Sequence, residues 1–257
     1  MKKVLLALTA LAAFTGSAVA ADLGARPYTK APIAAAPAVS WTGCWVSGGG
    51  GYGISRTDRY SRDAVTGATN VLGATSGSDG WLATAGVGCD YQFSGRWVVG
   101  AFADGTWSDI KGDHAWRVFG PGEAFVGESK MDWSWAVGGR VGYLVNPSFL
   151  TYVNAGYTQA RFAGVNFINQ SNGVPLDAQI GAQTYSGWFV GSGFEYNLGF
   201  LPGLFWKTEY RFAQYDRETL AVLNGAGGQL DSISSEKTIQ TIRSELVWRF
   251  NWSGGRY

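Results

Sequence analysis

Histidine, cysteine and charged residues are scarce in this chain of 257 residues. His114 is the single histidine, Cys44 and Cys89 are the two cysteines, and only 15% of the residues are charged. A protein zinc site takes about four nitrogen, sulfur or carboxylate ligands held close together, so the sequence predicts no metal site and no cofactor. A catalytic base must lie beside a nucleophile or acid, and His114 has no such setting, so we expect no enzyme and no catalytic residue.

Neither basic nor acidic residues are in excess. There are 20 Lys and Arg residues against 19 Asp and Glu residues, which leaves no basic surface of the kind that binds nucleic acid. Beyond the N-terminus no segment approaches the roughly 20 apolar residues of a transmembrane helix. These absences exclude nucleic-acid proteins and helical membrane proteins.

The first residues carry an export signal. Lys2 and Lys3 precede an apolar run over residues 4–14, and Ala18 and Ala20 form a small-residue cleavage site. We interpret residues 1–20 as a cleaved Sec signal peptide. Residues 21–40 are rich in proline and alanine and have no alternating pattern, so we predict an extended periplasmic leader. A short plug or an edge strand is the alternative for that leader.

Glycine and aromatic residues are abundant, with 38 Gly and 12 Trp, and they accompany a regular rhythm of strand-like segments. The connections between these segments alternate between long and short. This alternation predicts an all-β domain over residues 41–257, an eight-stranded antiparallel transmembrane β-barrel with short periplasmic turns and long extracellular loops. The eight segments are residues 41–54, 80–92, 96–107, 130–144, 150–161, 183–197, 204–215 and 237–250.

Residues within these segments alternate in character. In the last one, Leu246 and Trp248 share one face, while Arg243 and Glu245 share the other. A barrel in lipid turns the aromatic face outward and the charged face inward, and it gathers aromatic residues at the two membrane interfaces. The predicted aromatic girdle comprises Trp133, Tyr143, Trp188, Tyr196, Trp206, Trp248 and Phe250.

An eight-stranded barrel has an interior just wide enough to be filled by side chains. Charges in so narrow a lumen are expected to pair, because an unpaired buried ion loses its hydration. The sequence therefore predicts a lumen plugged by ion pairs, with a small porin-like channel as the alternative. The predicted lumen charge network is Asp90, Asp104, Asp132, Arg140, Glu195, Lys207, Glu209, Arg211, Arg243, Glu245 and Arg249.

Three smaller features have competing interpretations. Cys44 and Cys89 face each other at the periplasmic end of the first hairpin and reach an oxidising compartment, which predicts a structural disulfide, with free thiols as the alternative. His114, in the polar segment 108–129, is expected to be a solvated loop residue, with a weak metal or haem contact as the alternative. Arg56, Arg59 and Arg62 of the first long loop either contact lipopolysaccharide phosphates or are simply solvated.

Five stretches of the sequence resemble a known family. They are the ADL after the signal peptide, the Pro/Ala leader, the entry WTGCWV at residues 41–46, GVGCDYQF at residues 86–93, and ELVWRF at residues 245–250. Together they resemble the outer-membrane immunogenic protein family of alphaproteobacteria, which belongs to the OmpA-like eight-stranded barrels. One departure is that residues 251–257 follow Phe250, so Phe250, Trp252 or Tyr257 could serve as the aromatic insertion signal. Unlike full OmpA-type proteins, this chain is expected to have no periplasmic domain after the barrel that would bind peptidoglycan.

The resemblance implies a surface antigen of the Gram-negative cell outer membrane that supports envelope integrity, with haem binding or porin-like behaviour in some members. We therefore expect a barrel that serves envelope integrity and surface interaction. The alternatives are a small porin-like channel and a haem- or ligand-binding receptor. The expected partners are outer-membrane lipids, lipopolysaccharide and, during insertion, the barrel-assembly machinery.

Overall fold

The computed structural model describes residues 40–63, 66–67, 69–120 and 123–250. The predicted signal peptide (residues 1–20), all but the last residue of the leader (residues 21–40), and Trp252 and Tyr257 lie outside the described residues. Every regular element in the described part of the chain is a β-strand. This part contains no helix with the length and apolar character needed to cross a membrane.

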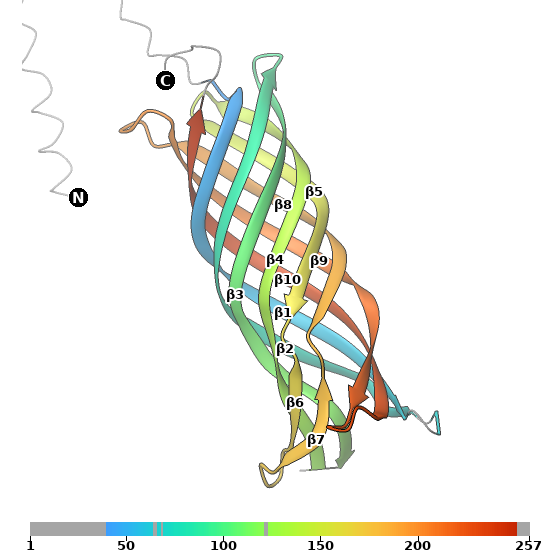
Figure 1. Cartoon of the computed structure of the whole chain (residues 1–257). Helices are drawn as coiled ribbons and strands as arrows, with labels where there is room; N and C mark the ends of the chain where they lie inside the picture. The colour runs from blue at the N-terminus through green and yellow to red at the C-terminus, as the bar shows by residue number, and fades with distance from the viewer. Residues whose placement is uncertain (1–39, 64–65, 68, 121–122, 251–257) are drawn as a thin grey trace, which may run out of the picture. The chain divides into compact units, whose positions relative to one another are not determined.

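Eight antiparallel strands close into a ring (Figure 1). Their bounds are β1 Gly43–Asp63, β2 Thr69–Phe93, β3 Trp97–Gly120, β4 Glu123–Asn146, β5 Phe149–Phe162, β8 Gln183–Asn197, β9 Leu204–Leu223 and β10 Gln229–Phe250. The order of the strands around the ring is β1, β2, β3, β4, β5, β8, β9, β10, and β10 pairs with both β9 and β1. The ring is closed over only part of the strand length, because the pairing of β2 with β3 ends at Asp79 and Lys111 although both strands continue. The predicted eight-stranded antiparallel fold is confirmed.

The hairpin of β6 (Val165–Asn169) and β7 (Pro175–Ile180) continues β5 and β8 beyond a two-residue break in each. β6 pairs with β4, and β7 pairs with β9 at Gln179 and Leu223. The hairpin thus takes over the place of β5 and β8 in the wall at this end of the barrel (Figure 1).

The short turns lie together at the opposite, periplasmic end. Only Ser94, Gly95 and Arg96 separate β2 from β3, and only Pro147 and Ser148 separate β4 from β5. Ser94 and Gly95 both have positive φ, the backbone that tight hairpin turns require.

The long connections differ from the prediction, because most of their residues are strand. β1 runs nine residues past the expected end at Ile54 before it stops at Asp63, and β10 begins at Gln229 rather than Lys237. A membrane span needs only about 9–11 tilted residues, yet six of the ring strands have 20–25 residues. The strands therefore continue well past the membrane as a second stretch of barrel.

The two stretches of barrel have opposite polarity. Near the C-terminal end of β10 the buried residues include Arg243 and Glu245, while Leu246 is exposed. Nearer its start, Ile233 is buried and Ser234 lies on the other face. We call the apolar-outside stretch the membrane half and the polar-outside stretch the outer half. The polar outward face of the outer half explains why its sequence resembles loops.

Aromatic side chains on the outward face form two rings that bound the membrane half. The strand ladder aligns Tyr52 with Trp81 and Trp107 with Trp133 in the ring next to the outer half. Trp133 and Trp188 of the predicted girdle lie at this outer ring, whereas Tyr143, Tyr196, Trp206, Trp248 and Phe250 lie at the periplasmic ring. From Trp97 to Trp107 a strand tilted by about 40° rises roughly 25 Å, which equals the usual apolar band.

Candidate functional site: the charged lumen and an outer groove

The lumen of the membrane half contains a closed quartet of two acids and two arginines. Asp90 of β2 and Glu195 of β8 each bind both Arg140 of β4 and Arg249 of β10. Arg140 donates from Nε to Asp90 Oδ1 at 2.8 Å and from Nη1 to Glu195 Oε2 at 3.1 Å. Arg249 donates to Asp90 Oδ2 at 2.8 Å and from Nη2 to Glu195 Oε1 at 2.7 Å. We call these four residues the lower quartet.

A second quartet lies further toward the outer half. Arg211 forms a two-point contact with Asp104, at 3.0 and 2.7 Å, and its Nε donates to Glu209 at 3.0 Å. Arg243 binds the same two carboxylates. Tyr152 completes the shell by donating its hydroxyl to Glu209 Oε2 at 3.0 Å. We call Asp104, Glu209, Arg211 and Arg243 the upper quartet.

One further pair completes the charges of the membrane lumen. Lys207 Nζ lies 2.6 Å from Glu245 Oε2, and Ser47 donates to the same oxygen at 2.6 Å. With the two quartets this gives five bases and five acids, which sum to zero net charge. Ten of the eleven residues predicted for the lumen network are placed here.

Asp132 is the exception, and the prediction that it faces the lumen is wrong. It lies half-buried between Met131 and Trp133, where β4 slips its register against β5. Met131 and Ser134 both turn inward, so the bulge adds one residue to the outward face. The alternation on which the prediction depended breaks at this point.

The periplasmic mouth is closed by apolar side chains below the lower quartet. Trp41 is fully buried, its ring lies 4.9 Å from that of Phe205, and its Nε1 donates to the carbonyl of Pro147 at 3.1 Å. The Arg249 guanidinium lies 4.7 Å above the Trp41 ring. This apolar layer also contains the buried residues Val98, Leu144, Leu150 and Val247.

The two cysteines form a disulfide in direct cross-strand register between β1 and β2. Cys44 and Cys89 share the outward face with Val46 and Val87, near the periplasmic aromatic ring. The disulfide therefore joins two wall strands on the lipid side and lies apart from the lumen charges.

His114 is not the solvated loop residue that we expected. It lies in β3, is 2% exposed, and packs 6.1 Å from the ring of Phe167 inside the outer half. The space beside it measures about 10 Å³, far too small for a porphyrin. The haem contact considered for His114 therefore has no room, and the described residues contain no group of three or more metal ligands.

Arg59 and Lys237 are buried inward charges that the sequence analysis did not assign to the lumen. Each is 2% exposed in the outer half. The signal was present in the sequence, since Lys237 keeps the odd-numbered phase of Arg243 and Glu245 along β10. The prediction omits Arg59 because it counts residues 55–79 as a loop, and it omits Lys237 because it follows the alternation of the last strand only from Ile242 onward.

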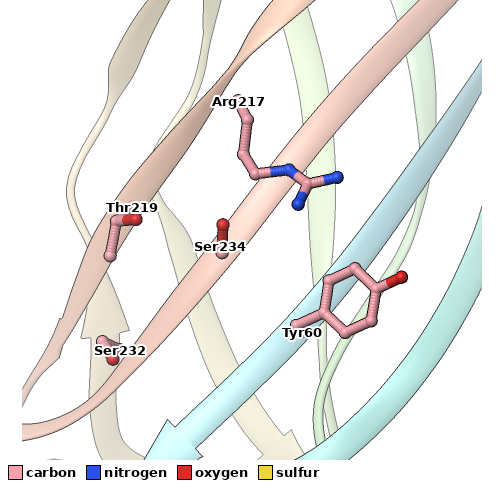
Figure 2. Close-up of a pocket in the computed structure, with 5 residues that line it drawn as sticks. All are labelled: Tyr60, Arg217, Thr219, Ser232 and Ser234. Atoms are coloured by element: carbon pink, nitrogen blue, oxygen red, sulfur yellow. The ribbon is translucent and has the colours of Figure 1, made fainter.

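A groove of about 540 Å³ lies on the outer wall of the outer half, across β1, β9 and β10. Its lining combines one aromatic ring, one guanidinium and three hydroxyls, from Tyr60, Arg217, Thr219, Ser232 and Ser234. Figure 2 shows the Arg217 side chain reaching toward the Tyr60 ring, with Ser234 between Thr219 and Tyr60. The Arg217 guanidinium lies 5.5 Å from the ring centroid and 2.9 Å from the Glu236 carboxylate. The register shift between β9 and β10 adjoins Arg217.

Comparison with known proteins agrees with this architecture. No family model matches the chain. The 31 kDa outer-membrane immunogenic proteins of Brucella melitensis biotype 1 and Brucella suis biovar 1 are each 26% identical over 258 residues, covering 97% of this chain and 100% of the relative. The chain is a homologue of these outer-membrane immunogenic proteins. It is an outer-membrane β-barrel.

Solved structures of outer-membrane proteins are also similar, at low identity. OprG of Pseudomonas aeruginosa is 12% identical with a TM-score of 0.49, covering 81% of this chain and 97% of OprG. Neisserial surface protein A is 12% identical with a TM-score of 0.36, covering 81% and 98%. The Escherichia coli outer-membrane protease OmpT is 11% identical with a TM-score of 0.40, covering 81% and 97%.

Proposed function

We propose that this protein is a non-conducting barrel that supports the integrity of the outer membrane and presents its outer half for interactions at the cell surface. The observation that carries this proposal is the filled lumen. Two quartets of buried ion pairs and an apolar layer at Trp41 lie in series along the barrel. The cavity near the upper quartet measures only about 30 Å³, which is room for about two or three water molecules.

A porin-like channel would require these side chains to leave the lumen. Each arginine would then give up contacts with two carboxylates, and breaking a buried pair costs about 3–5 kcal/mol. An open state is therefore populated rarely without an outside driving force. For the same reason the filled lumen favours the structural function over transport.

Conductance in a planar lipid bilayer tests the proposal. Barrels purified without their signal peptide, with folding confirmed by heat-modifiable gel migration, are expected to give no stable channels. The matched control is the double variant Arg140→Ala/Arg249→Ala, which removes both cations of the lower quartet and should admit small, salt-dependent currents if it folds. Stable porin-sized channels from the wild-type barrel would contradict the closed lumen.

For the surface interaction we infer that the groove at Tyr60 and Arg217 binds the saccharide region of lipopolysaccharide. Tyr60 lies eight residues beyond Tyr52 of the outer aromatic ring, which is about 20 Å outward for a tilted strand. At that height the wall faces the sugars of the outer leaflet. An aromatic face, hydroxyl groups and an arginine suit a sugar that carries an anionic group.

Retention of lipopolysaccharide by the purified barrel tests this inference. Arg217→Ala is expected to lower the bound lipopolysaccharide severalfold at constant detergent. Arg161→Ala serves as the control, because Arg161 is an exposed arginine on β5, away from the groove. Equal retention by both variants would remove the groove as the binding site while leaving the closed-lumen proposal untouched.

We also propose no catalytic activity and no cofactor for this barrel. The two quartets use their carboxylates in arginine pairs, and the single histidine is enclosed in the outer half. When the folded barrel is incubated with a peptide library, we expect no cleavage, and specific cleavage would contradict the proposal.

A further inference from the structure

The outer half encloses three basic side chains that come together from separate strands. They are Arg59 of β1, His114 of β3 and Lys237 of β10, and each is 2% exposed. Lys237 Nζ lies 3.5 Å from the Thr57 hydroxyl, 4.2 Å from the Phe162 ring centroid and 5.4 Å from that of Tyr185. We call Arg59, His114 and Lys237 the basic cluster.

The basic cluster lacks the partners that the membrane half supplies to its own charges. None of the ion pairs between described residues includes a member of the cluster. Within the same part of the chain, Arg59 Nε and Nη1 and both ring nitrogens of His114 have no hydrogen-bond partner. This contrasts with the two quartets, where every guanidinium binds two carboxylates.

The nearest acids do not supply the missing negative charge. Asp231 is buried on β10 but accepts from the Ser232 amide at 2.7 Å and makes no ion pair with Arg59 or Lys237. Asp58 is turned toward Arg56 and Thr75 on the outer wall, and Glu218 is exposed. Tyr185 contributes only a neutral hydroxyl. The interior of the cluster is therefore positive.

A buried positive charge is strongly unfavourable without a counter-charge. Burial together with the charge of Arg59 lowers the pKa of Lys237 to about 7, and the same causes lower the pKa of His114. Those two groups can lose their protons. Burial lowers the pKa of Arg59 only to about 10, so its guanidinium stays charged at neutral pH. At least one buried positive charge remains to be neutralised.

The space beside the cluster determines what can neutralise it. It measures about 10 Å³ and is bordered by His114, Ser129, Phe162, Tyr185 and Lys237. A cavity of roughly this size holds one water-sized particle. Of the basic cluster, His114 and Lys237 border this space and Arg59 does not. We propose that His114 and Lys237, with the charge of Arg59 nearby, form a binding site for a monatomic anion of halide size, such as chloride. Phosphate, sulfate and organic acids are too large for the site.

The bound anion would connect β3 and β10 across the interior of the outer half and offset the charge of Arg59 on β1. Arg59 and a protonated Lys237 would supply the charge, and the N–H of neutral His114 would supply a third donor. The outer half would thereby be stabilised by halide ions from the medium. This inference is independent of the closed lumen and of the saccharide groove.

Thermal unfolding of the folded barrel in detergent tests the site. Sodium chloride and sodium bromide are compared with sodium gluconate at equal ionic strength, so that screening of surface charges is the same in all three. The wild-type protein is expected to show a saturating rise in unfolding temperature with either halide and none with gluconate. Arg59→Met should abolish the halide effect, and Arg161→Met on the outer wall should retain it.

A bromide-soaked crystal provides the direct observation. An anomalous peak between His114 and Lys237 is expected. Equal unfolding temperatures of the wild-type protein in halide and gluconate, or a full halide effect in Arg59→Met, would overturn the proposal, as would the absence of the bromide peak. If Arg59→Met does not fold, Lys237→Met takes its place, and the comparison of salts on the wild-type protein still decides.

Discussion

Removal of Arg140 is the sharpest perturbation of the membrane lumen. Arg140→Met keeps the length of the side chain but leaves Asp90 and Glu195 to share Arg249, so the lower quartet changes from zero net charge to minus one. The lost contacts are one with Glu195 at 3.1 Å and two with Asp90, one of them at 2.8 Å. Removing one partner of a buried ion pair costs about 3–5 kcal/mol, and we expect a loss of unfolding free energy in that range.

A double-mutant cycle separates charge imbalance from loss of packing. Asp90→Asn alone leaves the lower quartet with a charge of plus one, whereas Arg140→Met/Asp90→Asn restores neutrality around Arg249 and Glu195. The double variant should therefore lose about 2–3 kcal/mol less unfolding free energy than the sum of the losses of the two single variants.

Urea unfolding in lipid vesicles, followed by tryptophan fluorescence, measures these free energies. Trp45 lies 4.8 Å below the Arg140 guanidinium and reports on the site. Arg161→Met, on the exposed wall, is the control and should cost no more than about 0.5 kcal/mol. A loss below about 1 kcal/mol for Arg140→Met, or strict additivity in the cycle, would refute a lumen held by coupled ion pairs.

Three further predictions concern single sites. Gly100→Ala should lower the free energy of unfolding by about 1–3 kcal/mol in the same urea assay, because its Cβ would clash with an Asp90 carboxylate oxygen and lie 2.8 Å from the Cys89 carbonyl oxygen. Gly105→Ala, whose Cβ would have its nearest atom at 3.8 Å, should change that free energy little, and equal losses for the two variants would contradict this geometry. Cys44→Ser removes a disulfide that closes a loop with a sequence separation of 45. The chain-entropy relation predicts a loss of about 4 kcal/mol of unfolding free energy. The loss is measured by comparing urea unfolding of the oxidised wild type and the variant. Lys237 has a pKa of about 7 when folded and about 10.4 when unfolded, so the unfolded chain binds more protons between these values and stability must rise with pH. In gluconate the unfolding free energy of the wild-type protein should rise by about 2 kcal/mol from pH 7 to pH 9 through this group, and Lys237→Met should not show this rise. If the variant still shows it, another titrating group is responsible.

The sequence was most informative where lipid imposes a single rule. In the membrane half most outward positions are apolar, so the alternation around Arg243 and Glu245 predicts both the strand and its inward face. The outer half follows the opposite rule, because water lies outside it. Its outward serines resemble loop residues, so the sequence predicts a long connection over residues 216–236, which includes the buried Ile233. Where two opposite polarity rules meet along one strand, composition alone cannot distinguish a strand from a loop.

Local irregularities account for the remaining errors. Asp132 was assigned inward because period-2 counting passes through a bulge without registering it. His114 was taken for a loop residue because its burial depends on Phe167 of the β6–β7 hairpin, about fifty residues later. Contacts of that kind between distant segments leave no periodic trace near either residue.

The reversal of polarity at the outer aromatic ring also determines how deep the barrel sits. Just outside that ring, the ladder aligns Asp79 with Lys111, and Lys111 with Lys130. One residue step along a tilted strand is about 2.5 Å, so a displacement of two steps toward the periplasm would carry this belt of charges into hydrocarbon. The opposite displacement would expose tryptophan rings to water. The barrel is thus held at one height, and the outer half stands at a constant distance above the bilayer.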